Sequence, residues 1–377
     1  MKQLLSILLI SSLANCVFAH CNQQMNPGNG KTATTNPLIT PLDKVVDSNV
    51  QPYMANKAAT GLSIAILKEG KTYFYGYGET AKGNKLIPGE HTIFEIGSIT
   101  KTFTAILLAD ASNNNKLKLE DPVNNYLPDS ISKLEFQGIP VTLKTMVNHS
   151  SGIPRMPSNF TGADFSNPYK DYDNNKLFSF YKNFLPIRKP GEKYEYSNLA
   201  MGTLGVMLER VYQKNYEAIF IEKISAPLGM NDTRQFIRKK DSSRFAKGYN
   251  ESGVYNSQWD FKAMAGAGAI RSTAADMIKY AKANLGEAPS SLRKAIELTH
   301  KITFIDGAKI GMAWHIIKPG ADEAIFHNGG TGGYRSYLAI NLKNKFAVVI
   351  LSNTSIATER VGNALMKWLE ENKMQDR

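Results

Sequence analysis

The sequence has little cysteine and few of the motifs that mark metal-dependent hydrolases. Cys16 and Cys21 are the only two cysteines among 377 residues, so neither a disulfide framework nor a zinc site built from cysteine pairs is expected. The motifs H-E-x-x-H and G-x-S-x-G are absent, which argues against zinc peptidases and α/β-hydrolases. The six histidines form no ligand set along the sequence. We therefore expect no metal and no cofactor.

Long apolar runs are also scarce. Residues 1–19 have the pattern of a secretory signal, with Lys2, an apolar run and a predicted cleavage site after Ala19. This run is too short to span a membrane, and no later stretch approaches about 18 uninterrupted apolar residues. We expect an exported protein, periplasmic or secreted, without a transmembrane segment. Lipidation of Cys16 is the less favoured alternative, because Asn15 stands where Gly, Ala or Ser is expected.

Acidic residues are outnumbered by basic ones, 33 to 45, which gives a formal net charge of +12. The longest basic run is only residues 238–240, and export would separate the protein from nucleic acid. We therefore expect a solvated basic surface and no nucleic-acid partner. A hydrophobic content of 42% over this length is enough for a large folded core.

The two ends of the chain carry the strand signals. Residues 20–37 are polar and predict a flexible tether before a single domain over 38–377. A predicted helix over 38–57 precedes two strand-like runs joined at Glu69-Gly70. Short β-type runs return between 310 and 353, and the last helix is expected over 358–372.

Helical patterns fill the middle of the chain. One of the helices is expected to begin near Thr273, with Asp276 at the spacing of a capping box. Strands at both ends with helices between them predict an α/β fold of the α+β type. One antiparallel sheet would be built from both chain ends and flanked by the terminal helices, with a helical lobe of about 98–300 inserted into it. A ligand would bind between sheet and lobe.

Ser98 and Lys101 form an S-x-x-K motif, which also occurs at Ser130/Lys133, Ser179/Lys182 and Ser291/Lys294. Ser98 differs from the other three because it opens the most apolar helix of the chain, "TFTAILLA". At i and i+3 the two side chains share a helix face. Burial of this helix would lower the pKa of Lys101, so that its amine could accept the serine proton.

A second motif, Tyr196-Ser197-Asn198, follows a Pro-Gly turn and opens a predicted helix. A tyrosine beside ammonium groups can have a lowered pKa and pass a proton to a leaving group. Asn198 could hold an amide of the substrate. A turn with a helix cap is the alternative reading, and His149 in "NHSSG" is expected to be a structural turn residue.

The third motif is His327-Asn328 followed by Gly329 and Gly330, at the end of a predicted strand. The glycines would let a substrate backbone approach closely. An edge strand here could pair with an extended acyl chain and supply a backbone N–H to an oxyanion hole.

In this order, S-x-x-K, Y-S-N and H-x-G resemble the serine β-lactamase and penicillin-binding superfamily, in the branch of class C β-lactamases, DD-peptidases and related esterases. The resemblance extends from about residue 42 to 371 and includes "FEIGSITKTFTA", "VNHSSGIP" and "PGEKYEYSNLAMG". It implies the β-lactamase/transpeptidase-like fold, with Ser98 as the acylated nucleophile. Lys101 and Tyr196 would share proton transfer, and Asn198 would hold the acyl amide of the substrate.

The same resemblance implies an oxyanion hole from the backbone N–H groups of Ser98 and Gly330. His327 stands where class C β-lactamases have a lysine. Asn328 replaces a Thr or Ser that helps to bind a substrate carboxylate, and Arg335 is a candidate replacement. The implied substrates are D-amino-acid peptides of the peptidoglycan stem type or β-lactams. A carboxylesterase and a penicillin-binding protein that does not hydrolyse are the alternatives, and the sequence does not choose among them.

Overall fold

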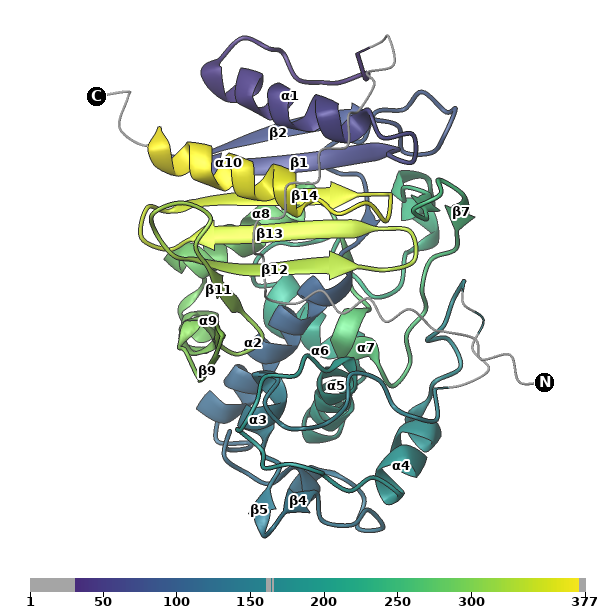
Figure 1. Cartoon of the computed structure of the whole chain (residues 1–377), viewed down its shortest axis with the longest axis vertical. Coiled ribbons are helices and arrows are strands. Elements are labelled where there is room, and N and C mark those ends of the chain that lie inside the picture. Colours follow the sequence, from purple (N-terminus) through teal and green to yellow (C-terminus); the bar gives the residue numbers. More distant parts are fainter. Residues whose placement is uncertain (1–30, 161–163, 165, 373–377) are drawn as a thin grey trace, which may run out of the picture.

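The main sheet takes its strands from both ends of the chain (Figure 1). The computed structural model describes residues 31–160, 164 and 166–372, and within them an eight-stranded sheet has the order β2-β1-β14-β13-β12-β11-β10-β9. All neighbouring strands in this sheet are antiparallel. The predicted fold class is therefore confirmed.

The strands of the main sheet are β1 (Gly61–Lys68), β2 (Lys71–Gly78), β9 (Phe304–Asp306), β10 (Ala308–Ile310), β11 (His315–Ile317), β12 (Ala324–Gly330), β13 (Arg335–Asn341) and β14 (Phe346–Ser352). Short strand pairs outside it are β3 (Phe94–Glu95) with β8 (Arg271–Ser272), β4 (Glu135–Phe136) with β5 (Ile139–Pro140), and β6 (Gly248–Tyr249) with β7 (Tyr255–Asn256).

The α-helices are α1 (Pro41–Met54), α2 (Thr100–Asn113), α3 (Leu143–Val147), α4 (Asn174–Lys182), α5 (Asn198–Tyr212), α6 (Tyr216–Phe220), α7 (Ala265–Gly268), α8 (Ala274–Lys282), α9 (Ser290–His300) and α10 (Glu359–Glu371). Short 3₁₀ or π turns are η1 (Gly97–Ile99), η2 (Val123–Tyr126), η3 (Ile221–Ser225), η4 (Lys239–Arg244) and η5 (Ala283–Glu287). Within this part of the chain no helix is long and apolar enough to cross a membrane.

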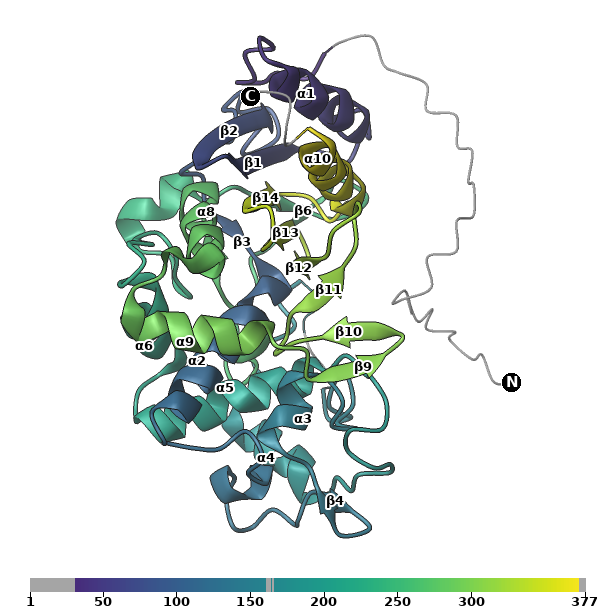
Figure 2. The same ribbon diagram turned by 90° about the vertical axis from the view of Figure 1, so that its left-hand side faces the viewer.

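Two hydrophobic cores hold the sheet between layers of helix. The terminal helices α1 and α10 cover one face and α8 lies against the other (Figure 2). Val46 of α1 and Leu365 of α10 belong to the outer core, together with Ile350 of β14. The inner core continues from β14 through α2 and α5, so these two helices are joined to the sheet by one apolar cluster. β14 is buried along its whole length because both of its faces are covered.

Several local predictions are confirmed. The first helix lies inside the predicted range 38–57 and is three residues shorter at each end, and the β1–β2 hairpin turns at Glu69-Gly70 as predicted. The last helix is one residue shorter at each end than the predicted 358–372. Thr273 is the N-cap of α8 and accepts a hydrogen bond from the backbone N–H of Asp276 at 3.1 Å. The Asp276 carboxylate does not complete a capping box; it accepts hydrogen bonds from the backbone N–H of Asp232 and the hydroxyl of Thr233.

The N-terminal segment departs in part from the prediction. The final residues of the predicted tether pair with β2, where the Thr35 N–H donates to the Gly76 carbonyl and the Gly78 N–H donates to that of Ala33. Asn36 is buried and donates to the hydroxyl of Tyr77. The chain is thus held from residue 33 onward. The predicted signal segment, Cys16 and Cys21 lie outside the described residues.

A close backbone contact joins the sheet to the start of α2. Gly97 has a φ of +49°, and a Cβ on it would lie 2.6 Å from the backbone nitrogen of Gly330. A Cβ on Gly329 would lie 2.0 Å from the carbonyl oxygen of Ile96. Because neither position has room for a side chain, β12 and η1 can approach each other through glycine backbone only.

This contact predicts that Gly329→Ala destabilises the protein. Since the clash is with backbone, the strand must move, and we expect a loss of roughly 1–3 kcal/mol in the free energy of unfolding, measured by denaturant titration. Gly89→Ala is the matched control, because nothing lies within 4 Å of a Cβ at Gly89. Equal stability of the two variants would show that the contact is not tight.

Candidate active site

The Ser98 and Lys101 side chains meet at the junction of sheet and helices. Ser98 lies in the 3₁₀ turn η1, and the α-helix α2 begins two residues later, at Thr100. The Lys101 Nζ is 3.0 Å from the Ser98 Oγ. The expected i, i+3 approach is therefore present, although Ser98 precedes the α-helix itself.

Lys101 is an unusual lysine because its side chain is fully buried. Burial, and to a lesser degree the positive charge of Arg155, hold the pKa of Lys101 well below its usual range. Its Nζ also donates a hydrogen bond of 2.6 Å to the carbonyl oxygen of Ala267 in α7. A neutral amine in this position keeps a lone pair with which it can accept the Ser98 proton.

The three other S-x-x-K motifs have no such environment. Their serine and lysine side chains are all exposed to solvent: Ser130, Lys133, Ser179, Lys182, Ser291 and Lys294. They therefore lack the burial that removes solvation from a charged amine. Burial is thus what separates Ser98 and Lys101 from the three repeats of the motif.

Tyr196 lies beside this pair, just before α5. The Lys101 Nζ is 4.8 Å from the centre of the Tyr196 ring, and the guanidinium carbon of Arg155 is 5.0 Å from it. The sequence suggested a lowered tyrosine pKa, but burial raises the pKa of Tyr196 above its usual value, and the opposing effects of Ser98 and Arg155 are smaller. Tyr196 is therefore a protonated phenol at neutral pH.

Hydrogen bonds fix the segment that carries Tyr196. Ser197 is the N-cap of α5 and accepts from the backbone N–H of Ala200 at 2.9 Å. Its own backbone N–H donates to the Nδ1 of His149 at 3.2 Å, and the His149 ring packs 4.6 Å from that of Tyr196. His149 has a φ of +62°, so it does occupy a turn, and it also supports Tyr196. Asn198 is half-buried, and its amide lies 3.6 Å from the sulfur of Met156.

The strand β12 brings only part of the motif at residues 327–330 to the site beside Ser98 and Tyr196. His327 is fully buried on the side of Tyr196, with 6.4 Å between the ring centres. Alternation along the strand puts Asn328 on the other face, where its side chain donates to the carboxylate of Glu359 in α10. The structure therefore does not bring the Asn328 side chain to Ser98. The backbone of Gly330 does lie there, against Gly97.

His149 and His327 lie beside the Tyr196 ring, and His315 lies beside His327. Each has a buried ring nitrogen without a partner among the described residues: the Nε2 atoms of His149 and His327 and the Nδ1 of His315. The His315 Nε2 pairs with the hydroxyl of Tyr194 at 2.8 Å, and its ring is 5.4 Å from that of His327. Burial lowers the pKa of all three, that of His315 to about 4. They are neutral at pH 7. In the described part of the chain no group of three potential ligands has the arrangement of a metal site.

Arg155, His315 and Tyr194 belong to this site but carried no sequence motif. Arg155 follows the "VNHSSGIP" segment, which contributes to the family resemblance but does not include Arg155. His315 lies on β11, and only the pairing of β11 with β12 brings it beside His327. The contacts of Arg155, His315 and Tyr194 with the site join segments far apart in the sequence, so no local sequence pattern predicts them.

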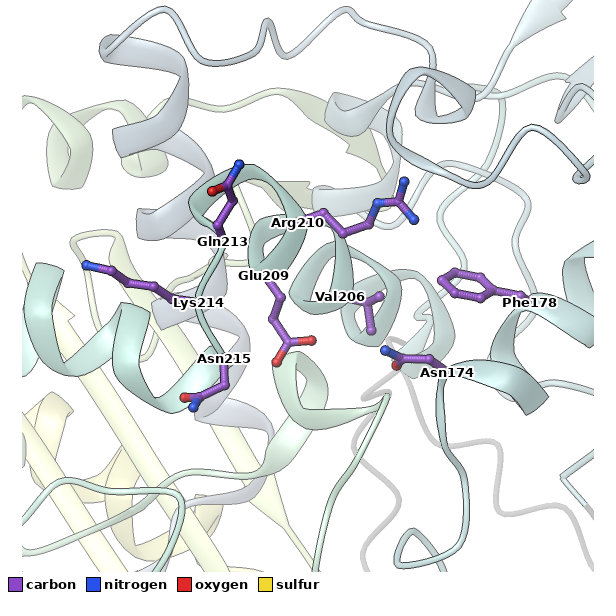
Figure 3. Close-up of a pocket in the computed structure, with 8 residues that line it drawn as sticks. All are labelled: Asn174, Phe178, Val206, Glu209, Arg210, Gln213, Lys214 and Asn215. Carbon is purple, nitrogen blue, oxygen red and sulfur yellow. The ribbon is translucent and has the colours of Figure 1, made fainter.

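A separate hollow lies at the C-terminal end of α5, and Figure 3 shows the residues that line it. It is bordered by Asn174, Phe178, Val206, Glu209, Arg210, Gln213, Lys214 and Asn215. None of the site residues named above lines it, and the Glu209 carboxylate there accepts from the backbone N–H of Tyr216. We assign it no part in the chemistry.

Comparisons with known proteins show the family and the fold of the chain. The sequence model of the Beta-lactamase family matches residues 46–370. A β-lactamase of Pseudomonas fluorescens is 29% identical over 348 residues, which cover 83% of this chain and 94% of that protein. The D-alanyl-D-alanine-carboxypeptidase/endopeptidase AmpH of Escherichia coli K12 is 26% identical over 330 residues, 83% of this chain and 84% of its own. A class C β-lactamase crystal structure has the same fold, with a TM-score of 0.78 at 24% identity over 86% of this chain and 97% of that one.

Fold, site and relatives together define the class, and the protein is a serine hydrolase. The chain belongs to the Beta-lactamase family, because the family model covers most of its length.

The lowered pKa of Lys101 predicts how the reactivity of Ser98 depends on pH. Below that pKa the amine is protonated and cannot accept a proton, so the rate of sulfonylation by phenylmethylsulfonyl fluoride should fall as the pH is lowered. We expect the rate to reach its plateau well below the 10.5 of an ordinary lysine.

Lys101→Met should slow this sulfonylation by roughly 10²–10⁴-fold and remove its pH dependence. Lys182→Met, in one of the exposed copies of the motif, is the control and should leave both unchanged. A half-maximal rate near pH 10.5, or an unaffected Lys101→Met variant, would show that Lys101 is not the base.

Proposed function

We propose that the protein hydrolyses amide bonds through an acyl-enzyme on Ser98. The observation that carries this proposal is the 3.0 Å contact between the Ser98 Oγ and a fully buried Lys101 amine. A serine hydroxyl is a weak nucleophile unless a neighbouring base removes its proton. Burial favours the neutral form of the Lys101 amine, which lies within hydrogen-bond distance of the Ser98 Oγ.

In the acylation step, the Ser98 Oγ attacks the substrate carbonyl carbon as its proton passes to the Lys101 Nζ. The resulting oxyanion is held by the backbone N–H groups of Ser98 and Gly330, because Gly330 packs against the residue next to Ser98. The bond to the leaving group then breaks, and the leaving nitrogen takes a proton from the Tyr196 hydroxyl. Lys101 returns its proton to Tyr196, so that both groups end as they began.

In the deacylation step, water replaces the leaving group. The Lys101 amine accepts a proton from this water as it attacks the ester carbonyl, and the Ser98 Oγ receives that proton as it leaves. The raised pKa of Tyr196 favours the phenol over the phenolate, which suits a proton donor in the first step. Burial lowers the pKa of His149 and of His327, so these rings add no positive charge beside Tyr196.

For the substrate we favour D-amino-acid peptides of the peptidoglycan stem type and β-lactams. The names of relatives that match most of this chain support this choice, since they are β-lactamases and a D-alanyl-D-alanine carboxypeptidase. We further propose that the protein acts outside the cytoplasm, because residues 1–19 have the pattern of an export signal. Fractionation of cells that express the full chain would test the location.

The assignment of Ser98 is tested by Ser98→Ala. With the nucleophile removed, we expect turnover of any substrate found to fall by at least about 10³-fold while the far-UV circular dichroism is unchanged. Ser179→Ala removes an exposed serine from another S-x-x-K motif and should retain wild-type activity. Full turnover by Ser98→Ala would contradict the assignment.

The substrate class is tested with three compounds: a fluorescent penicillin, a D-Ala-D-Ala peptide and a p-nitrophenyl ester. The proposal expects turnover of the penicillin or the peptide, and a mass increase on the Ser98 peptide when the reaction is stopped early. Turnover of the ester alone would favour a carboxylesterase. Stable labelling without turnover would favour a penicillin-binding protein that does not hydrolyse.

A further inference from the structure

Arg155 places a charged group directly beside the proposed catalytic residues. Its guanidinium carbon lies 5.0 Å from the centre of the Tyr196 ring, and the Lys101 Nζ lies 4.8 Å from the same centre. An arginine stays protonated at any working pH. Burial favours the neutral form of Lys101, whereas Arg155 presents its guanidinium to the same tyrosine ring.

The backbone of Arg155 is fixed in this position. Its carbonyl oxygen accepts hydrogen bonds from the backbone N–H groups of Asn198 at 3.0 Å and Leu199 at 3.2 Å. The preceding carbonyl, of Pro154, accepts from the Ser197 hydroxyl at 2.7 Å. Arg155 is therefore attached to the first turn of α5, the same turn that positions Tyr196.

The charge of Arg155 has no protein counterion. Arg155 is exposed, and among the described residues no carboxylate lies within ion-pair distance of its guanidinium. The nearby Arg188 differs, since it pairs with Glu195 at 2.7 Å. An exposed guanidinium that stacks on a ring but lacks a counterion leaves its N–H groups available to an anion.

On the other side of Ser98, the described strands β12 and β13 offer no free cation. Burial keeps His327 neutral. Arg335, the sequence candidate for holding a carboxylate, donates to the carbonyl oxygens of Thr331 and Tyr334 and lies 3.8 Å from the carboxylate of Glu251. The Asn328 side chain is turned toward α10. An anionic substrate group would thus find its positive partner on the α5 side.

We propose that Arg155 binds a carboxylate of the substrate and so selects anionic substrates over neutral ones. This inference rests on the proposed function, since it names the substrate class of the same site. The planar guanidinium can form two parallel hydrogen bonds to a carboxylate, a geometry that a lysine cannot reproduce. The exposed position of Arg155 would let the anion bind before the reacting bond reaches Ser98.

The test compares two esters that differ by one terminal carboxylate, p-nitrophenyl butyrate and p-nitrophenyl hemiglutarate, and the matching pair of a D-Ala-D-Ala peptide with a free or an amidated C-terminus. For Arg155→Gln we expect kcat/KM to fall by roughly 10- to 100-fold on the carboxylate members, mainly through KM, and by less than about 3-fold on the neutral ones. Arg155→Lys should recover only part of the loss, because it restores the charge but not the planar fork.

Arg210→Gln is the matched control, since it removes one positive charge from the exposed far end of α5 (Figure 3). It should leave the ratio between carboxylate and neutral substrates unchanged. Equal losses on both members in Arg155→Gln, with a shifted pH profile, would assign Arg155 to tuning Lys101 and overturn the proposal. No loss on either member would overturn it as well. Failure of the wild type on every ester and peptide would instead refute the proposed function.

Discussion

The proposed chemistry depends on one constraint, the burial of the Lys101 amine. A lysine taken out of water loses much of its affinity for a proton, and the cost is tolerable only if the amine is neutral and hydrogen-bonded. The carbonyl of Ala267 supplies one such bond, and the Ser98 hydroxyl lies at the remaining position. The large core around α2 excludes water from this amine. The same apolar packing therefore stabilises the fold and lowers the pKa of Lys101.

The sheet, which is built from both ends of the chain, positions one side of the site. β12 is held between β11 and β13, and its last residues press against η1 at Gly97. This contact brings the backbone of Gly330 to the residue next to Ser98. The 149–155 segment and the first turn of α5 are joined by hydrogen bonds, which hold Tyr196 and Arg155 beside each other. The site is therefore assembled from two parts of the fold that meet at Ser98.

The sequence predicted the antiparallel sheet and the pairing of Ser98 with Lys101, because both depend on local patterns: apolar runs, turn residues and the i, i+3 spacing. It also located Tyr196 and His327, although a family resemblance was needed to give them roles. It did not predict that Asn328 faces α10, since the facing of a strand residue depends on which neighbour covers each side. Nor did it reveal Arg155 or His315, whose importance comes from contacts across distant segments. The raised pKa of Tyr196 was missed because burial outweighs the nearby cation.

The central claim is that Lys101 is neutral at working pH, and a titration of its amine would test it most directly. Lysine labelled with ¹³C at Cε gives one resonance for each side chain, and the Lys101→Met variant identifies the signal of Lys101. The account predicts one lysine that titrates well below the 10.5 of an ordinary side chain and disappears from the spectrum of the variant. If the Lys101 signal titrated with the exposed lysines instead, Lys101 could not be the base that activates Ser98.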